Sequence, residues 1–231
     1  MTGIFTGWSL ALLLGIRHAM EPDHVAAVST LVAERRSVGA GRAALVGALW
    51  GVGHAITLLV VGGVLLLMRA RMQPWLADAF EGAVAAMLLL LGARSIRQAV
   101  RAGNEGPRHP HEHGHSHHAH HGPAVHVHVG DVTLAGRPLA IGLMHGLAGS
   151  GALTALVLAS MPSTVSAVVY LVVFALGAMT GMALLTGLAG WPLARLARSR
   201  RSYALLVGTA GLVSLVLGVV SGWPLAHKWW F

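Results

Sequence analysis

A short stretch near the start of the chain carries five ionisable side chains inside an otherwise apolar segment. It reads Arg-His-Ala-Met-Glu-Pro-Asp-His, and its ionisable members are Arg17, His18, Glu21, Asp23 and His24. A charged side chain in the middle of a bilayer costs about 2.5–3.5 kcal/mol on insertion scales, so such residues are functional by default. Imidazole nitrogen and carboxylate oxygen without thiolate suit borderline divalent ions such as nickel, cobalt, zinc and copper. The stretch therefore predicts a site for a divalent metal ion.

A break in the first segment is needed to bring these donors together. On a regular helix His18, Asp23 and His24 point in different directions and cannot share a face. Pro22 lies between them and interrupts the helix, because proline lacks the backbone N–H and clashes one turn back. We expect an unwound turn to gather His18, Asp23 and His24 around one centre. Arg17 and Glu21 are four residues apart, and we expect them to pair on one helix face and orient the site.

Further ligands must come from other segments. Outside a long polar loop the remaining histidines are His54, His145 and His227. His54 lies midway along an apolar segment, and His145 precedes the glycine-rich stretch 146–151, which includes Ser150, a candidate orienting residue. Buried histidines are often satisfied core residues, and this alternative stays open; His227, beside a lysine, is expected to be solvated. The predicted metal ligands are His18, Asp23, His24, His54 and His145.

The long polar loop carries ten of the fifteen histidines. They are His109, His111, His113, His115, His117, His118, His120, His121, His126 and His128. A tract of this kind has almost nothing to bury, so we expect it to be disordered without metal. Alternating imidazoles on a flexible chain bind divalent metals with low selectivity, which indicates a metal-capturing loop.

The overall composition excludes several classes of protein. The chain has 231 residues, of which 55% are hydrophobic and 10% are charged, whereas soluble domains carry about 25% charged residues. The chain has no cysteine, which excludes a disulfide scaffold, a thiolate metal site and a thiol-redox relay. The net charge is +8, but the basic residues flank apolar segments, so no nucleic-acid partner is expected.

Six segments are apolar and long enough to cross a membrane. They span about residues 5–32, 43–68, 77–100, 138–161, 164–191 and 203–222. Twelve of the sixteen Lys and Arg residues fall on one side of these segments. By the positive-inside rule that side is cytoplasmic. We therefore expect a multi-pass protein of the cell (inner) membrane, with both termini outside and the histidine-rich loop in the cytoplasm.

The two halves of the chain resemble each other in sequence. Residues 15–18 (Gly-Ile-Arg-His) are similar to residues 142–145 (Gly-Leu-Met-His), and Gly-Gly-Ser patterns recur in register in the third and sixth segments. A unit with an odd number of spans re-enters the bilayer in the opposite sense, so the repeat would be inverted. The predicted fold is all-α, with two inverted three-helix repeats and interrupted helices 1 and 4. The expected units are residues 1–103, the loop 104–136, and residues 137–231.

The first segment resembles the signature of the NiCoT/NicO superfamily of nickel/cobalt transporters. That signature, His-x4-Asp-His, is matched by His18, Asp23 and His24, and the preceding arginine by Arg17. Together with His-Gly-Leu-Ala-Gly-Ser-Gly at 145–151, the stretch is similar to the six-helix, urease-accessory-like branch. The eight-helix importers of the superfamily carry an Asp-Thr-Ala-Thr-Glu signature that this chain lacks. The resemblance implies nickel or cobalt as the transported ion.

Three functions remain open at this point. The first is a secondary transporter of nickel or cobalt, not an enzyme and without a bound cofactor, since no nucleotide-binding motif is present. The second is an accessory protein that hands metal to a cytosolic metalloenzyme. The third is a di-iron membrane oxygenase. Such enzymes need about eight histidines in several short boxes, and the apolar segments of this chain have too few. The expected partners are the lipid bilayer and a divalent metal ion, with a cytosolic metallochaperone and a second copy of the chain as further candidates.

Overall fold

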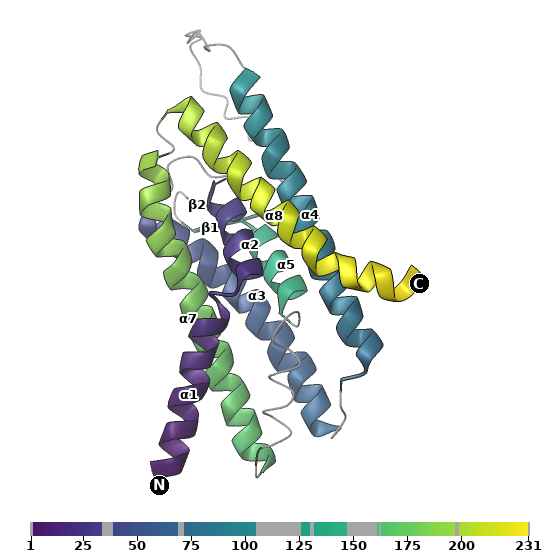
Figure 1. The fold of residues 1–231 in the computed structure, drawn as a ribbon. Coiled ribbons are helices and arrows are strands. Elements are labelled where there is room, and N and C mark those ends of the chain that lie inside the picture. Colours follow the sequence, from purple (N-terminus) through teal and green to yellow (C-terminus); the bar gives the residue numbers. More distant parts are fainter. Residues whose placement is uncertain are drawn as a thin grey trace.

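The computed structural model describes residues 2–33, 39–68, 72–104, 126–129, 132–146, 161, 163–196 and 199–230. Within this part of the chain there are seven helices and one two-stranded hairpin (Figure 1). The helices are α1 (Thr2–His18), α2 (Pro22–Ala33), α3 (Ala40–Leu67), α4 (Pro74–Asn104), α5 (Arg137–His145), α7 (Thr164–Leu196) and α8 (Arg200–Trp230). The strands are β1 (His126–Val129) and β2 (Val132–Ala135). The predicted helical class is thus confirmed for the described residues outside the hairpin.

Four of these helices are long and apolar enough to cross a membrane. They contain the spans Ala40–Leu67, Pro74–Ala102, Thr164–Gly190 and Arg200–Lys228. Their outward faces carry many exposed leucine and valine side chains, which is the surface expected to face lipid. The chain is therefore a membrane protein. Helices α4, α7 and α8 have 31, 33 and 31 residues and extend beyond the apolar segments, because hydropathy does not detect polar helix ends.

The predicted interruption of the first segment at Pro22 is confirmed. Helix α1 ends at His18 and α2 begins at Pro22, the first helical position, where proline is best tolerated because its missing N–H has no partner there. Between the two helices the chain makes tight turns, in which Met20 N–H donates to the Arg17 carbonyl and Glu21 N–H to the His18 carbonyl. The break therefore places the C-terminal end of α1 next to the N-terminal end of α2.

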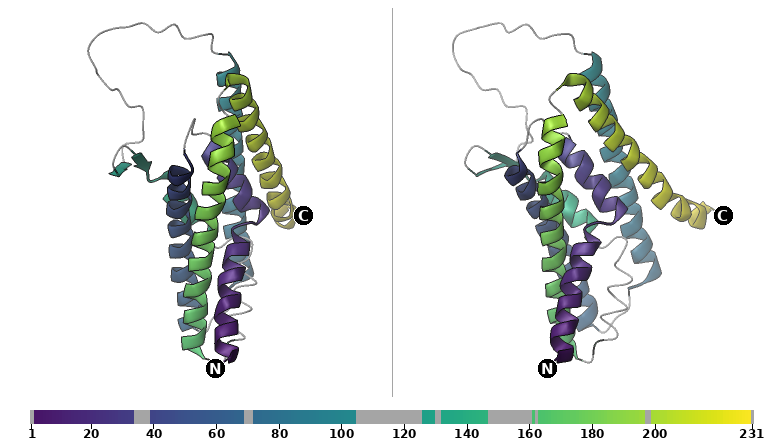
Figure 2. Two further views of the ribbon diagram at one scale, coloured as in Figure 1. Left: turned by 90° about the vertical axis from the view of Figure 1, so that its left-hand side faces the viewer. Right: turned by 60° about the vertical axis from the view of Figure 1, so that its left-hand side comes forward.

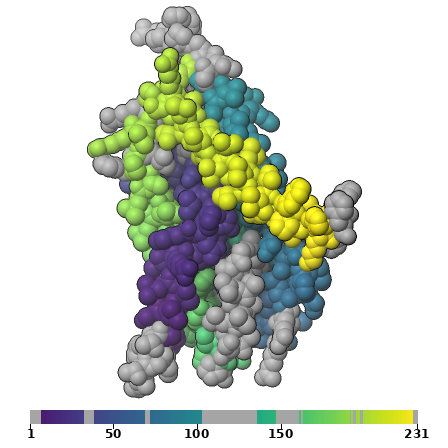
Figure 3. All heavy atoms as spheres, in the orientation of Figure 1, coloured from purple at the N-terminus to yellow at the C-terminus, as the bar shows by residue number. Residues whose placement is uncertain are grey.

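The helices pack as two long pairs with shorter helices against them. Helix α3 packs on α7, and α4 packs on α8. Helix α1 lies along α7, α5 lies along α3, and α2 packs on α8, α7 and α4 (Figures 1 and 2). In the space-filling view α2 fills the region between α7 and α8 (Figure 3). Its apolar residues, including Ala27, Val28 and Leu31, join a buried cluster with Trp50 and Leu88.

Glycines bring the short helices into backbone contact with the long ones. A Cβ atom at Gly15 of α1 would lie 2.8 Å from the Ala178 nitrogen of α7, and one at Gly142 of α5 would lie 2.9 Å from the His54 nitrogen of α3. Such distances leave no room for a side chain. Gly15 and Gly142 each lie one helical turn before a buried histidine, at position 18 or 145. The close crossings therefore fix where those histidines enter the interior.

The hairpin corrects the expectation for the histidine-rich loop. Strands β1 and β2 pair antiparallel, with His126 opposite Ala135 and Val129 opposite Val132. The prediction that the tract lacks regular structure is therefore wrong at its end. The reason is visible in the sequence, since His-Val-His-Val and Val-Thr-Leu-Ala are rich in β-branched residues and are separated by Gly-Asp, a typical hairpin signal.

Candidate metal centre

The five predicted ligand residues lie together where several helix ends meet. His18 is the last residue of α1 and His145 is the last residue of α5. Asp23 and His24 lie in the first turn of α2, and His54 lies in the middle of α3. The ends of α1 and α5, the start of α2 and the middle of α3 thus bring donors from distant parts of the chain together inside the bundle.

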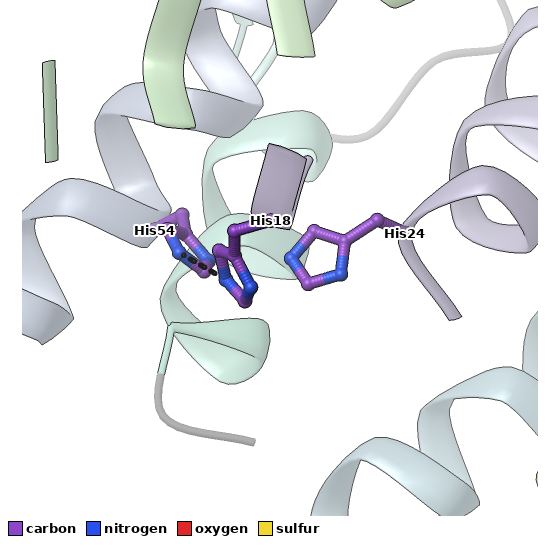
Figure 4. A group of neighbouring side chains, drawn as sticks. All are labelled: His18, His24 and His54. Carbon is purple, nitrogen blue, oxygen red and sulfur yellow. Dashed lines mark hydrogen bonds between the residues drawn. The ribbon is translucent and has the colours of Figure 1, made fainter. Parts of the chain in front are cut away.

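Three imidazoles form the first group of donors. His18, His24 and His54 offer ring nitrogens that all lie within 4.8 Å of one another, and their side chains are 3%, 0% and 0% exposed. Figure 4 shows His24 with one ring edge turned toward His18, and His18 joined to His54. The Nε2 atoms of His18 and His54 are 3.2 Å apart, close to the separation of about 3.4 Å expected for two nitrogens at tetrahedral positions of one ion.

Two carboxylates hold the imidazoles in place. The His24 Nδ1–H donates to Asp23 Oδ1 at 2.9 Å, and the His145 Nε2–H donates to Asp23 Oδ2 at 3.0 Å. Asp23 Oδ1 also accepts the backbone N–H of His24 at 2.8 Å. Glu21 Oε2 lies 3.1 Å from His18 Nδ1. A carboxylate on the far nitrogen of an imidazole fixes the ring and raises its basicity, an arrangement common in metal sites.

The expected pair between Arg17 and Glu21 is wrong. Among the described residues no ion pair joins them; Glu21 instead contacts His18. The physical reason is that α1 ends at His18, so Arg17 and Glu21 are not on adjacent turns of one helix. Arg17 is exposed, and Glu21 is 35% exposed. The orienting role predicted for Glu21 is compatible with its contact to His18, whereas Arg17 forms no ion pair with another described residue.

Several buried nitrogens around the site have no hydrogen-bond partner within the described part of the chain. They are His24 Nε2, His54 Nδ1, His145 Nδ1 and Trp50 Nε1. A buried polar nitrogen without a partner costs about 1–3 kcal/mol. Of these atoms, His24 Nε2 lies on the ring edge that faces His18, so an ion bound between these imidazoles would satisfy it. Trp50 Nε1 carries a hydrogen and cannot bind a cation. The donor set of imidazoles and a carboxylate fits a borderline divalent ion.

Helix ends add an electrostatic preference for a cation. Helices α1 and α5 end at His18 and His145, and their last carbonyls carry the partial negative charge of a helix C-terminus. Helix α2 begins at the same place, but the Asp23 carboxylate in its first turn offsets the positive end. The combined field of two C-termini and one carboxylate therefore favours positive charge at the cluster.

Three neighbours of the site were not predicted. Trp50 lies one turn before His54, with its ring centroid 5.5 Å from His24 and 5.9 Å from His145. Phe174 of α7 lies 5.6 Å from the His18 ring. Thr57, one turn after His54, donates from Oγ1 to the Leu143 carbonyl at 2.8 Å and ties α5 to α3. For Trp50 a signal existed, because it is the one tryptophan in the middle of an apolar segment.

Other predicted residues are not tested by the structure. Ser150 lies outside the described residues, as do eight of the loop histidines. These eight are His109, His111, His113, His115, His117, His118, His120 and His121. His126 and His128 belong to β1, and nothing is described of their side chains. His227 is exposed near the end of α8, away from the buried cluster.

Two known proteins are similar to the chain over most of its length. It is 33% identical over 217 residues to the urease accessory protein UreH of Bacillus sp. (strain TB-90), a match that covers 91% of the chain and 88% of UreH. It is 27% identical over 186 residues to the chloroplast protein FOR GROWTH AND FERTILITY 2 of Arabidopsis thaliana, covering 79% of the chain and 45% of that protein. No protein-family model and no solved structure matches the chain.

Proposed function

The chain belongs to the family of the urease accessory protein UreH, and on that premise we propose that it is a secondary membrane transporter of divalent nickel or cobalt. The observation that carries the proposal is the buried cluster of His18, His24, His54, His145 and Asp23 at the break between α1 and α2. The transported ion is the substrate, and no resident cofactor and no enzymatic reaction are proposed. Membership of the wider NiCoT/NicO superfamily, which the signature in α1 and α2 resembles, is part of the same proposal.

The chemistry of the cluster suits a site that binds and releases an ion. Imidazole nitrogens replace the water molecules of a borderline cation, and Asp23 offsets part of its charge. Ligands must be deprotonated to bind metal, so proton uptake by the imidazoles would promote release. Because the sequence contains no nucleotide-binding motif, we propose that transport is driven by the membrane potential or by protons.

A six-span inverted repeat is the architecture that we propose for this transporter. The glycine contacts support it. Gly15 of α1 meets the Phe174 carbonyl and the Ala178 nitrogen of α7, and Gly142 of α5 meets the Trp50 carbonyl and the His54 nitrogen of α3 in the same way. The α4–α8 pair repeats the pattern, since Gly92 meets Gly211 and Leu215, and Gly218 meets Ala85 and Leu89. These reciprocal contacts are those expected when a two-fold axis exchanges α1 with α5, α3 with α7 and α4 with α8.

In this arrangement α1 and α2 together form the first span and α5 begins the fourth. The proposed domains are residues 1–103, the loop 104–136 and residues 137–231. By the arginine distribution both termini face outward and the loop lies in the cytoplasm. The cell membrane is the proposed location, and a cytosolic metal-binding protein is a proposed partner.

Radiolabelled ion flux tests the proposal directly. The purified chain is reconstituted in oriented vesicles, and entry of nickel or cobalt is followed with and without a membrane potential. We expect saturable flux above that of empty vesicles, and the sign of the potential that drives it gives the direction. Tight binding of nickel without any flux, in either direction, would refute transport.

The name of the relative favours a second candidate function. UreH is a urease accessory protein, so the chain could instead hand metal to a cytosolic metalloenzyme without moving it across the membrane. Under this alternative the loop histidines are the working ligands, and their removal abolishes metal transfer to an acceptor enzyme. Under transport, the same removal lowers only the apparent affinity for the ion.

A further inference from the structure

We infer that the buried cluster holds the ion in two separate positions, on opposite edges of the His24 ring. The inference rests on the proposed function and deepens it, since an ion that crosses the membrane would occupy both positions in turn. One position is formed by His18, His24 and His54, and the other by Asp23, His24 and His145.

The two nitrogens of His24 face different sets of donors. Its Nδ1 lies 2.9 Å from Asp23 Oδ1. Its Nε2 is buried without a hydrogen-bond partner in the described chain, and the ring edge facing His18 is visible in Figure 4. The two lone-pair directions of one imidazole diverge, so a single ion cannot use both nitrogens of His24. A ligand shared by both groups therefore separates two binding positions.

Ring distances give the same division. A ring nitrogen binds an ion at about 2.1 Å, which places the ring centroid about 3.2 Å from the ion and two tetrahedrally arranged centroids about 5 Å apart. The centroid of His54 is 5.0 Å from that of His18 and 5.4 Å from that of His24, which fits one shared ion. The centroid of His145 is 4.1 Å from that of His24 but 6.5 Å from that of His54, so His145 lies beside His24 and away from His54.

Asp23 belongs to the second position. Its two carboxylate oxygens reach His24 Nδ1 and His145 Nε2 at 2.9 and 3.0 Å, and the donor atoms of Asp23, His24 and His145 lie within 4.8 Å of one another. While an ion occupies the three-imidazole position, Asp23 accepts hydrogen bonds from His24 and His145 as it does in this structure. The carboxylate becomes a ligand only when the ion moves past His24.

X-ray absorption at the nickel edge tests the two positions. The sample is the full chain with serine at the ten loop histidines and one equivalent of nickel. It is measured without further change and with each of five single substitutions: His54→Ala, His18→Gln, His145→Ala, His24→Ala and His227→Ala. We expect nickel in His145→Ala to keep three imidazole ligands and no carboxylate. In His54→Ala and in His18→Gln we expect two imidazoles and a carboxylate, and in His24→Ala we expect binding to be lost. His227→Ala is the control for removal of a histidine elsewhere.

The outcomes separate this inference from the proposed function. Identical nickel shells in His54→Ala and His145→Ala, or loss of binding in both while their unfolding temperatures are unchanged, would show a single centre and overturn the inference. His18→Gln and His54→Ala each remove one ligand of the three-imidazole position, so the test still works if one of the two variants fails to fold. If the shells differ as expected but the unsubstituted chain shows no flux, the two positions hold and transport is refuted. If flux is normal and the shells are identical, transport stands and the two positions are refuted.

Discussion

His145 Nε2 donates a hydrogen bond of 3.0 Å to Asp23 Oδ2, although the two residues are 122 positions apart in the chain. The bond joins the end of α5 to the start of α2, and it links the two halves of the proposed repeat at the site itself. Asp23 Oδ1 at the same time accepts from His24. One carboxylate therefore sets the orientation of two imidazoles.

Asp23→Asn tests this relationship. An amide offers one acceptor oxygen in place of two, so its NH₂ group would face an imidazole N–H without a partner. Loss of a carboxylate that orients metal-binding histidines typically costs about 10–100-fold in affinity or activity. We expect nickel flux to fall by about this factor while the helix content by circular dichroism is unchanged.

The matched control is Asp78→Asn. Asp78 forms an ion pair with the half-exposed Lys228, and exposed pairs contribute about 1 kcal/mol or less. Flux in Asp78→Asn should equal that of the unsubstituted chain. Equal flux in both variants would mean that Asp23 does not act on the ion.

Removal of the shared imidazole provides the second prediction. His24→Ala takes a ligand from both donor groups, so we expect flux to fall to the level of empty vesicles. His227→Ala removes an exposed histidine near the end of α8 and should retain full flux. Measurable transport by His24→Ala at saturating nickel would contradict a pathway through the cluster.

Much of the site was predictable because it depends on local features. Pro22 among ionisable residues predicts a break, and the break brings His18, Asp23 and His24 within reach of one another. The partner of Glu21 was mispredicted because spacing along an unbroken helix assumes that the helix continues past His18.

The rest depends on how separate helices cross. The place of His145 relative to His54 follows from the crossing of α5 on α3 at Gly142 and Gly53, and no periodicity along one segment contains that information. Phe174 is an apolar position in an apolar segment, so only the packing identifies it as a neighbour of the imidazoles. The hairpin β1–β2 is different, because β-branched residues on both sides of Gly-Asp predict it from the sequence. It was missed because the many histidines led us to expect disorder throughout the tract.

A third prediction concerns the glycine crossings. A Cβ atom at Gly53 would lie 2.9 Å from the Leu143 nitrogen of α5, so Gly53→Ala forces α5 away from α3. Overpacking of this kind costs about 1–3 kcal/mol, and it displaces His145. We expect a lower unfolding temperature in detergent and a higher KM for nickel.

Gly63→Ala on the same helix is the control. A Cβ atom there has nothing within 4 Å, and alanine is favoured over glycine in a helix by about 1 kcal/mol. The unfolding temperature of Gly63→Ala should be equal to or above that of the unsubstituted chain. Similar destabilisation by both substitutions would contradict the close crossing at Gly53.

The fourth prediction separates transport from metal delivery. Serine at the ten loop histidines should raise the KM for nickel and leave the maximal flux unchanged, because the loop only concentrates ions near the buried site. Flux and metal transfer to an apo-enzyme acceptor are measured on the same preparation. Unchanged KM for flux together with abolished transfer would favour the accessory function.

The last prediction concerns the hydrogen bond that ties α5 to α3. Thr57 Oγ1–H donates to the Leu143 carbonyl at 2.8 Å, which occupies one of the carbonyls that a helix leaves free in its last turn. Thr57→Val keeps the shape of the side chain but removes the donor, at a cost of about 1 kcal/mol. Because His145 follows Leu143 in the same last turn, we expect a higher KM for nickel as well as a lower unfolding temperature.

Thr180→Val is the control for this loss of a hydroxyl. Thr180 Oγ1–H donates to the Leu176 carbonyl within its own helix, at 2.7 Å, so its removal breaks no contact between helices. We expect KM to remain unchanged in Thr180→Val. Equal KM in Thr57→Val and Thr180→Val would show that the end of α5 keeps its position without this hydrogen bond, held by the glycine crossing and by the packing of α5 on α3.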